Sequence, residues 1–287
     1  MDALRARFAD RVLGVATMHG KERVIGPALM KALPIVGYQA IGEVDTDRFG
    51  AFSGEVQRQL DPRPTAIEKA KHGAEVSGME LVIASEGSFG PYPPAPFISC
   101  NEEFFALYDA RDGAVFEHKH LTLETNFGGE VCSTPAQVTA FAQRMRFPEH
   151  ALVLRSTEHW RADTVQVKGI HQQEELLRTA NDLLAAHGTV WVETDMRAMC
   201  NPTRMKMIGA TAERFAAELI RTCPRCSHFY FHITSAVPGL PCGLCGSPTE
   251  SVRSFVRHCQ QCDFTTEEPR TDGKQVEEPQ FCGHCNP

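Results

Sequence analysis

The chain has 287 residues, of which 42% are hydrophobic and 23% charged, a composition typical of one large globular domain or two smaller ones. The formal net charge of −7 argues against a broad nucleic-acid-binding surface, although it does not exclude a local basic patch. No segment reaches the roughly 20 apolar residues of a membrane span, and residues 1–20 lack the apolar core of a signal peptide. We therefore expect a cytoplasmic protein without membrane contact.

Apolar runs alternate with amphipathic segments along residues 1–220, which we expect to form one α/β domain. The predicted strands lie at 11–16, 37–44, 81–84, 104–109, 115–125, 152–154, 165–167 and 190–192. The predicted helices run over 22–33 and 172–187 and begin near 64, 134 and 201. Strands that alternate with helices in this way predict an α/β fold with a mixed sheet and helices on both faces.

Local signals mark several element boundaries. The run 111–113 (Arg-Asp-Gly) predicts a hairpin turn between two strands. Thr65 and Glu68 fit a capping box at the start of a helix. Thr134–Pro135 and Asn201–Pro202 also predict helix starts, because each joins a capping side chain to a proline.

The stretch Ala84–Phe97 follows a predicted strand and combines a carboxylate, two serines, two glycines and four prolines. Gly87 and Gly90 would let the backbone turn sharply and approach a ligand closely. The prolines predict a stiff, extended segment after the turn. A structural turn needs neither the carboxylate nor both hydroxyls, so we expect Glu86 to be functional.

Polar side chains gather at the predicted carboxyl ends of the strands, where ligands bind in sheets of this kind. Hydroxyls, a lysine and arginines suit a phosphate, helix N-termini add N–H donors, and carboxylates suit a magnesium ion held with the phosphates. We therefore expect one pocket for a phosphorylated small molecule. Its candidate residues are the substrate-binding Thr17, His19, Lys21, Ser85, Ser88, Arg197, Asn201 and Arg204 and the catalytic Glu86, Asp45 and Asp47.

Each of these residues also has a purely structural explanation. Asp45 and Asp47 could cap a turn, Asn201 suits a helix N-terminus whatever the function, and Arg197 could pair with surface acids. His19 taken alone is more often structural than catalytic. Only the shared location at strand ends favours a common function.

A first functional hypothesis is a metal-dependent hydrolase that cleaves a phosphoanhydride in a nucleotide or another phosphorylated small molecule. Magnesium bridged by Glu86 and by Asp45 or Asp47 would polarise the phosphate and position water. Ser85 and Ser88 would orient the substrate. The candidate lysine and arginines would neutralise the charge that develops on the phosphate.

Short motifs resemble those of the inosine/xanthosine triphosphate pyrophosphatases. Residues 16–21, Ala-Thr-Met-His-Gly-Lys before a predicted helix, resemble the opening strand, polar turn and phosphate-binding lysine of that family. Residues 65–70 and 81–89 resemble its central helix and acidic strand end, and 197–204 resembles its base-binding segment. The resemblance implies an α/β nucleotide pyrophosphatase with Lys21 at the phosphates.

The sequence also departs from that family. His19 stands where the family has Asn, and the paired glutamates expected before the central helix are missing, with Glu55 the nearest acid. Residues 150–190 and the C-terminal tail have no counterpart in it. The whole chain resembles an uncharacterised bacterial family with a C-terminal zinc-binding tail, a similarity that implies no activity.

Most of the cysteines lie in residues 221–287, which we expect to form a separate zinc-ribbon domain. The four Cys-x-x-Cys pairs are Cys223/Cys226, Cys242/Cys245, Cys259/Cys262 and Cys282/Cys285. Each pair places two thiolates on one knuckle, and two knuckles complete a tetrahedral zinc site. We expect two zinc ions, both structural because four-cysteine sites leave no open position. The spacing leaves sequential and interleaved pairing of the knuckles open.

A second functional hypothesis makes the chain a binding protein whose zinc ribbons recognise nucleic acid or a protein partner, with a non-catalytic α/β ligand-binding domain. Arginines at 221, 225, 253 and 257 favour it slightly, but glutamates at 267, 268, 277 and 278 interrupt any basic stripe. Both hypotheses allow a homo-oligomer. Clustering of Glu86, Asp45, Lys21 and Arg204 in one cleft would favour the enzyme, and their dispersal would favour the binding protein.

Overall fold

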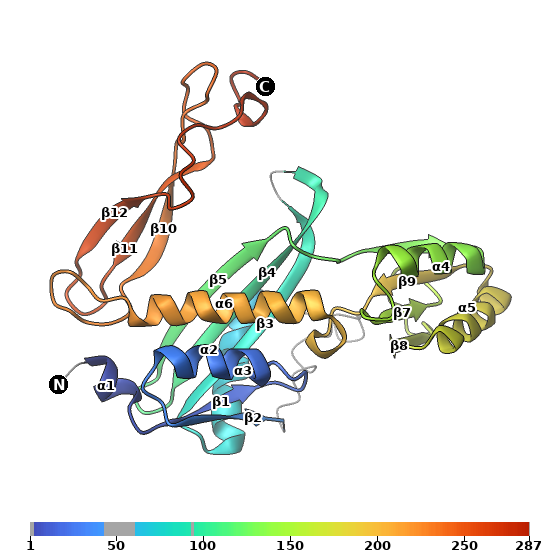
Figure 1. Ribbon diagram of the computed structural model, residues 1–287, viewed down its shortest axis with the longest axis horizontal. Helices are drawn as coiled ribbons and strands as arrows, with labels where there is room; N and C mark the ends of the chain where they lie inside the picture. Colours follow the sequence, from blue (N-terminus) through green and yellow to red (C-terminus); the bar gives the residue numbers. More distant parts are fainter. Residues whose placement is uncertain (1–2, 43–60, 93–94, 287) are drawn as a thin grey trace. The chain divides into compact units, whose positions relative to one another are not determined.

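The structure is a computed structural model that describes residues 3–42, 61–92 and 95–286 (Figure 1). The predicted catalytic residues Asp45 and Asp47 lie outside these described residues. The chain forms two units: residues 10–31 with 35–215, here called the α/β unit, and residues 1–9, 32–34 and 216–287, here called the ribbon unit. None of the helices in the described part of the chain has the length and apolar character needed to span a membrane.

The α/β unit contains a five-stranded mixed sheet in the order β2-β1-β3-β4-β5. Its strands are β1 (Val12–Ala16), β2 (Gly37–Ile41), β3 (Leu81–Tyr92), β4 (Ala95–Asp109) and β5 (Ala114–Thr122). β1 is parallel to β2 and β3, whereas β4 is antiparallel to β3 and β5. The mixed sheet and the hairpin at 111–113 predicted from the sequence are therefore confirmed.

Helices cover both faces of this sheet, as the sequence predicts. On one face, Ala70 and Ala74 of α3 (Pro62–Ser77) belong to the same buried cluster as Val82 of β3. On the opposite face, the ring of Phe105 in β4 lies 6.2 Å from that of Phe215 in α6 (Pro202–Ile220), measured between centroids. Because successive strand residues point to opposite faces, the side chains of β3 alternate between the face that α3 covers and the opposite face.

Strand β3 continues through the stretch for which the sequence predicts a sharp turn. Glu86 pairs with Phe104 of β4, and Gly87 pairs with Glu103. The turn prediction is wrong because the antiparallel neighbour β4 supplies backbone hydrogen-bond partners to a segment that looks irregular in isolation. Gly87 is required for another reason: a Cβ atom there would lie 2.5 Å from Arg204 Nη2 and 2.7 Å from Glu103 Oε1.

The helix starts agree with the sequence in part. α4 (Pro135–Arg144) begins as predicted, and the hydroxyl of Thr134 accepts a hydrogen bond from Gln137 N at 3.3 Å. α3 begins at Pro62, so the predicted capping box is wrong and Thr65 lies inside the first turn. Its hydroxyl donates to Asp61 O at 2.9 Å instead of capping the helix. Proline near the N-terminus, whose fixed φ already suits a helix, explains the earlier start.

Residues 129–194 form a second sheet, which the sequence analysis did not separate from the first. Its antiparallel strands, in the order β6-β9-β7-β8, are β6 (Gly129–Cys132), β7 (Leu152–Arg155), β8 (Gln166–Ile170) and β9 (Val190–Thr194). α4 and α5 (Gln173–His187) contribute to its core, which includes Phe141, Leu154, Leu183 and Val192. Hydrophobic periodicity indicates that a strand exists but not which strands pair with it.

The ribbon unit combines helix α1 (Ala3–Phe8), the end of α6 and a three-stranded antiparallel sheet. The sheet consists of β10 (His232–Pro238), β11 (Val252–His258) and β12 (Thr265–Pro269). Phe8 lies edge-on to Phe229, with ring centroids 5.5 Å apart. Arg257 of β11 forms an ion pair with Glu218 of α6, in which Nη1 lies 2.6 Å from Oε2. The first contact joins α1 to the segment before β10, and the second joins β11 to the end of α6.

Candidate functional site

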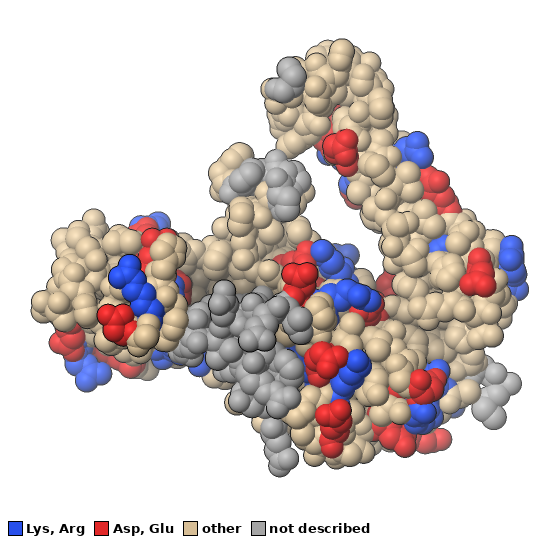
Figure 2. All heavy atoms as spheres, turned by 180° about the vertical axis from the view of Figure 1, so that it is seen from behind, with Lys and Arg blue, Asp and Glu red and all other residues tan. Residues whose placement is uncertain are grey.

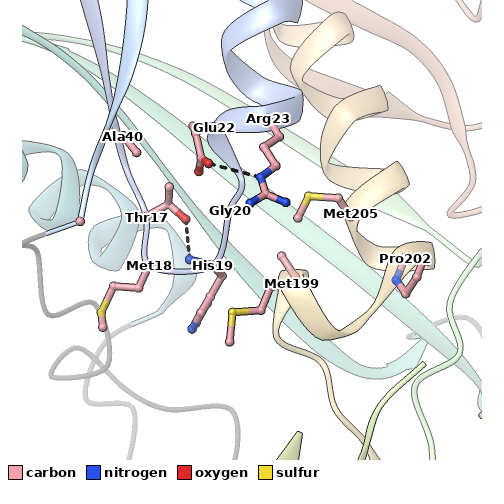
Figure 3. A pocket seen from close by; sticks show the side chains of 12 residues that line it. Thr17, Met18, His19, Gly20, Glu22, Arg23, Ala40, Met199, Pro202 and Met205 are labelled. Atoms are coloured by element: carbon pink, nitrogen blue, oxygen red, sulfur yellow. Dashed lines mark hydrogen bonds and ion pairs between the residues drawn. The ribbon is translucent and has the colours of Figure 1, made fainter. Parts of the chain in front are cut away.

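A cavity of about 670 Å³ lies in the α/β unit at the carboxyl ends of β1 and β2 (Figure 3). Its walls come from the β1–α2 loop, the start of α2 (Glu22–Ala32), the end of β2, the 3-10 helix Ala198–Cys200 and the start of α6. Its polar lining includes Thr17, His19, Glu22 and Arg23. Small-molecule pockets measure roughly 300–1,000 Å³, and this cavity is within that range.

The β1–α2 loop that forms one wall has a fixed shape. Thr17 is buried, and its hydroxyl accepts a hydrogen bond from His19 N at 3.1 Å. Gly20 has a φ of +71°, a left-handed conformation that favours glycine. The chain then enters α2, whose first N–H groups have no partner within the helix. Since Glu22 of α2 and Pro202 of α6 both line the cavity, two helix N-termini, each with a positive partial charge, face it.

Lys21 lies between two lining residues and is itself buried. Its ammonium group donates to Ser85 O at 3.1 Å and to Ser85 Oγ at 3.0 Å. Burial, and next the positive charge of Arg204, lower the pKa of Lys21 to about 8, although Glu103 and Glu86 oppose the shift. The structure therefore brings two of the predicted residues, Lys21 and Ser85, into direct contact beside the cavity.

Arg204, in the first turn of α6, forms a fully buried ion pair with Glu103 of β4. Arg204 Nε donates to Glu103 Oε1 at 2.8 Å, Nη1 donates to Met196 O, and the guanidinium carbon lies 5.1 Å from the centroid of the Phe89 ring. The other carboxylate oxygen of Glu103, Oε2, is buried and has no hydrogen-bond partner in the described part of the chain. Arg204 thus connects the start of α6 to the sheet.

The segment before α6 is fixed by its own polar contacts. Asn201 Oδ1 accepts from Arg204 N at 3.0 Å, and Asn201 Nδ2 donates to Asn126 Oδ1 at 2.9 Å. Arg197 Nη2 lies 2.6 Å from Asp195 Oδ2. The predicted residues Asn201 and Arg197 therefore hold the segment that forms this wall of the cavity, but neither is among the residues that line it.

The pKa of His19 reflects its burial and the charges beside the cavity. Burial is the largest cause of its shift, followed by the positive charges of Lys21, Arg204 and Arg197, while Asp195 acts in the opposite direction. Together they lower the pKa of His19 to about 4. The imidazole is therefore neutral at pH 7, and the potential around it favours negative charge.

This shift predicts a specific loss of stability in acid. Between pH 6.5 and about 4 the unfolded chain binds a proton at His19 that the folded protein does not bind, so stability falls as pH decreases through this range. The His19→Asn variant should lose less unfolding free energy between pH 7 and 5 than the wild type, as measured by urea titration at both values. The exposed His171→Asn variant serves as the control. Equal losses in all three proteins would contradict the assignment.

The structure places Glu86 away from the cavity-lining residues. Glu86 Oε2 lies 2.5 Å from Lys69 Nζ of α3, and the two side chains are 3% and 7% exposed. By strand alternation Glu86 and Ser88 point to the face that α3 covers, whereas Ser85 points to the other face, where Lys21 reaches it. The predicted residues Thr17, His19, Lys21, Ser85, Asn201 and Arg204 thus gather on one side of the sheet, and Glu86 and Ser88 do not join them.

The sequence analysis did not single out Lys69 or Glu103, which pair with Glu86 and Arg204 respectively. The sequence does carry a signal for Lys69, because it lies between the small apolar residues Ala66 and Ala70, which are buried in α3. A charge at such a position is stable only with a partner. Glu103 carries a weaker signal, because it shares one face of β4 with the apolar Phe105, and an acid on a buried face needs a partner.

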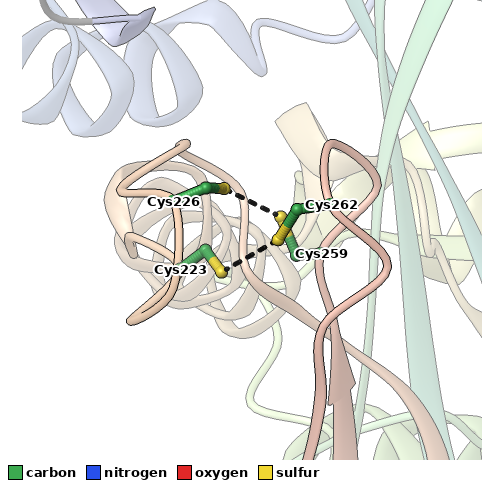
Figure 4. Close-up of side chains that lie close together, drawn as sticks. All are labelled: Cys223, Cys226, Cys259 and Cys262. Atoms are coloured by element: carbon green, nitrogen blue, oxygen red, sulfur yellow. Dashed lines mark hydrogen bonds between the residues drawn. The ribbon is translucent and has the colours of Figure 1, made fainter.

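The ribbon unit contains two clusters of four cysteines. One consists of Cys223, Cys226, Cys259 and Cys262 (Figure 4), and the other of Cys242, Cys245, Cys282 and Cys285. The first knuckle therefore pairs with the third and the second with the fourth. Of the two arrangements that the sequence left open, the structure has the interleaved one.

The sulfur positions fit tetrahedral metal coordination. The Sγ–Sγ distances are 3.7 Å for Cys223–Cys262 and 3.6 Å for Cys226–Cys259. A tetrahedral zinc with Zn–S bonds near 2.3 Å would separate its sulfurs by about 3.8 Å. In the second cluster the distances are 3.9 Å for Cys242–Cys285 and 3.7 Å for Cys245–Cys282. Disulfides, with S–S near 2.05 Å, do not match these spacings, so both clusters could hold a metal ion.

Comparison with known proteins gives one family and a weak structural likeness. A family model described as a domain of unknown function, DUF6671, matches residues 69–287. A CinA superfamily protein from Klebsiella pneumoniae 700603 is 16% identical, with a TM-score of 0.26 over 41% of this chain and 75% of that chain. The competence damage-inducible protein A (ComA) from Klebsiella pneumoniae subsp. pneumoniae MGH 78578 is also 16% identical, with a TM-score of 0.25 over 41% and 74%. No curated protein matches the chain.

Proposed function

The chain belongs to the DUF6671 family, and we propose that its α/β unit binds a nucleotide or another phosphorylated small molecule in the cavity at the ends of β1 and β2. The observation that carries this proposal is the convergence of two helix N-termini on one cavity, beside the buried cations Lys21 and Arg204. Helix N-termini present N–H donors and a positive partial charge to an anion. After burial, the charges of Lys21 and Arg204 also lower the pKa of His19.

We extend the proposal to metal-assisted hydrolysis of a phosphoanhydride in that ligand. Magnesium is usually bound through one or two carboxylates together with the phosphates of the substrate. Within the described residues, Glu22 is the carboxylate that lines the cavity, and it lies in the first turn of α2. Glu22 could hold the magnesium ion, which would supply Lewis-acid polarisation of the phosphate when bound.

A panel of phosphorylated compounds tests binding and cleavage separately. Equilibrium dialysis with nucleoside triphosphates, sugar phosphates and inorganic tripolyphosphate measures binding, while released phosphate and pyrophosphate are measured with and without magnesium. We expect micromolar to millimolar binding of at least one class and magnesium-dependent product release. Binding without release would limit the function to ligand binding. No binding of any compound would contradict the proposed function itself.

Substitution of Arg23 tests whether the ligand lies at the start of α2. The Arg23 side chain lines the cavity and is 82% exposed, so its removal should not disturb the fold. Arg23→Met should weaken binding of the phosphorylated ligand by about tenfold, the scale of one lost hydrogen bond to a charged group. Arg178→Met, an exposed change on α5 with the same loss of charge, should leave affinity unchanged. Equal affinity in both variants would place the ligand elsewhere.

The binding-protein hypothesis has less support from the ribbon unit. Its arginines are largely engaged by acids: Arg221 with Glu268, Arg253 with Glu267, and Arg257 with Glu218 and Glu268. Figure 2 shows Lys and Arg interspersed with Asp and Glu over the face in view. Cations paired in this way contribute little to phosphate binding. Recognition of nucleic acid or a protein partner by the ribbons therefore stays a prediction.

A further inference from the structure

The cavity at the ends of β1 and β2 has an apolar part that a phosphate does not need. Three of its lining residues are methionines, Met18, Met199 and Met205, and two are alanines, Ala40 and Ala198. The polar lining side chains, Thr17, His19, Glu22 and Arg23, come from the β1–α2 loop and the start of α2. A ligand that fills the whole cavity therefore needs a charged end and an apolar end.

Two of these methionines are unusually exposed for their residue type. Met18 is 48% exposed and Met199 is 55% exposed, although methionine is usually buried. A single exposed apolar side chain needs no explanation. These two come from different elements, the β1–α2 loop and the 3-10 helix Ala198–Cys200, yet both line the same cavity. In Figure 3 both side chains extend to the same side as that of His19.

The backbone under each methionine is anchored. Met18 follows the buried Thr17, whose hydroxyl is bonded to His19 N. Met199 lies between Ala198 and Cys200, which are 2% and 4% exposed. Cys200 N donates to Arg197 O at 2.9 Å, and Ala151 N donates to Cys200 O at 3.0 Å. The backbone thus holds both methionines at the cavity, while their exposed side chains can still change rotamer.

We propose that Met18 and Met199 bind a planar aromatic part of the ligand, such as a nucleobase, while the phosphates lie at the start of α2. This inference rests on the proposed function and adds to it the class of ligand and the residues that select it. Thioethers are polarizable, adapt to irregular surfaces and make favourable contacts with aromatic rings. The imidazole of His19 lines the same cavity. Its pKa of about 4 leaves it neutral at pH 7, so it adds a flat, uncharged ring to the methionines.

Sugar phosphates fit this wall poorly. The hydroxyls of a sugar need hydrogen-bond partners when they leave water, and a methionine sulfur is only a weak acceptor. A nucleobase offers a large apolar face to the methionines and can keep its polar edge toward His19 or solvent. The wall therefore favours a nucleotide over a sugar phosphate of similar charge.

The test compares three probes and two kinds of variant. ATP, inorganic tripolyphosphate and ribose 5-phosphate are titrated into the full-length protein by calorimetry, at one ionic strength. ATP should bind at least about tenfold more tightly than tripolyphosphate, and ribose 5-phosphate should bind more weakly than ATP. Met18→Ser and Met199→Ser should each weaken ATP binding by about tenfold, or 1.4 kcal/mol, and leave tripolyphosphate binding within about twofold.

Met30→Ser is the matched control, because Met30 is 45% exposed on α2 and does not line the cavity. Thermal melts of all three variants verify that they fold. Equal affinities for ATP and tripolyphosphate, or ATP binding that is unaffected by both cavity substitutions, would overturn the inference and leave the proposed function intact. If none of the three probes binds, the proposed function fails first and the inference fails with it.

Discussion

Removal of bound metal by a chelator should unfold the ribbon unit and leave the α/β unit folded. The cysteine clusters account for much of the ribbon's interior, since the small core around Phe231 includes Cys223 and Cys259 themselves. Without a metal, each cluster brings four cysteine side chains together with no ion to bind them. The protein then loses the metal-binding free energy, which is about 10–16 kcal/mol for a typical structural zinc. We propose zinc as this metal because four-cysteine tetrahedral sites are characteristic of it.

Elemental analysis of the purified protein should find about two zinc ions per chain by this four-cysteine reasoning. Hydrogen exchange before and after chelation then shows which unit opens. Protection should be lost across β10, β11 and β12 and retained in the five-stranded sheet. A chelated, metal-free protein whose ribbon strands stay protected would contradict the proposal that the clusters are structural zinc sites.

The interleaved arrangement makes a sharper version of this test. Cys242→Ser should expose Cys285 to thiol reagents and leave Cys226 protected by metal, because Cys242 and Cys285 share a cluster that excludes Cys226. Sequential pairing would give the reverse result, with Cys226 reactive. Cys100→Ser, a buried cysteine outside both clusters, is the control and should change the reactivity of neither.

The sequence predicted the parts of the fold that depend on local chemistry. Continuous apolar runs located β1 and β7, and helical spacing located α5, since each pattern comes from residues that are neighbours in the chain. Only the start of β3, residues 81–84, was predicted, because the two glycines and the proline that follow in this strand are tolerated through pairing with β4. The second sheet was missed for the same reason: pairing partners are set by contacts far apart in sequence.

The candidate site was predictable to a similar extent. The rule that ligands lie beyond strand carboxyl ends pointed to Thr17 and His19, which line the cavity. It could not show that Ser85 and Glu86, adjacent in the chain, face opposite sides of the sheet, because a predicted turn hides the two-residue alternation of a strand. It also could not locate the apolar wall, since Met199 reaches the cavity from a distant segment.

Glu86→Gln should destabilise the α/β unit strongly. The substitution leaves the Lys69 ammonium buried beside a neutral amide, and removal of one partner of a buried ion pair typically costs about 3–5 kcal/mol. Urea unfolding of the variant measures this loss. Glu68→Gln, on the same helix as Lys69, is the matched control: its pair with Lys71 is 49% and 41% exposed, and such a pair contributes about 0–1 kcal/mol.

A double-mutant cycle with Lys69→Met separates the pair from other effects of each change. If the two side chains stabilise the fold mainly through each other, the double variant should be more stable than the sum of the two single losses predicts.

The same variants also test the catalytic role that the sequence suggested for Glu86. A carboxylate engaged by Lys69 at 2.5 Å on the face covered by α3 should affect stability and leave ligand turnover nearly unchanged. A roughly hundredfold loss of turnover with unaltered stability would instead assign Glu86 an acid–base or metal-binding role, and would require α3 to move away from the sheet during the reaction.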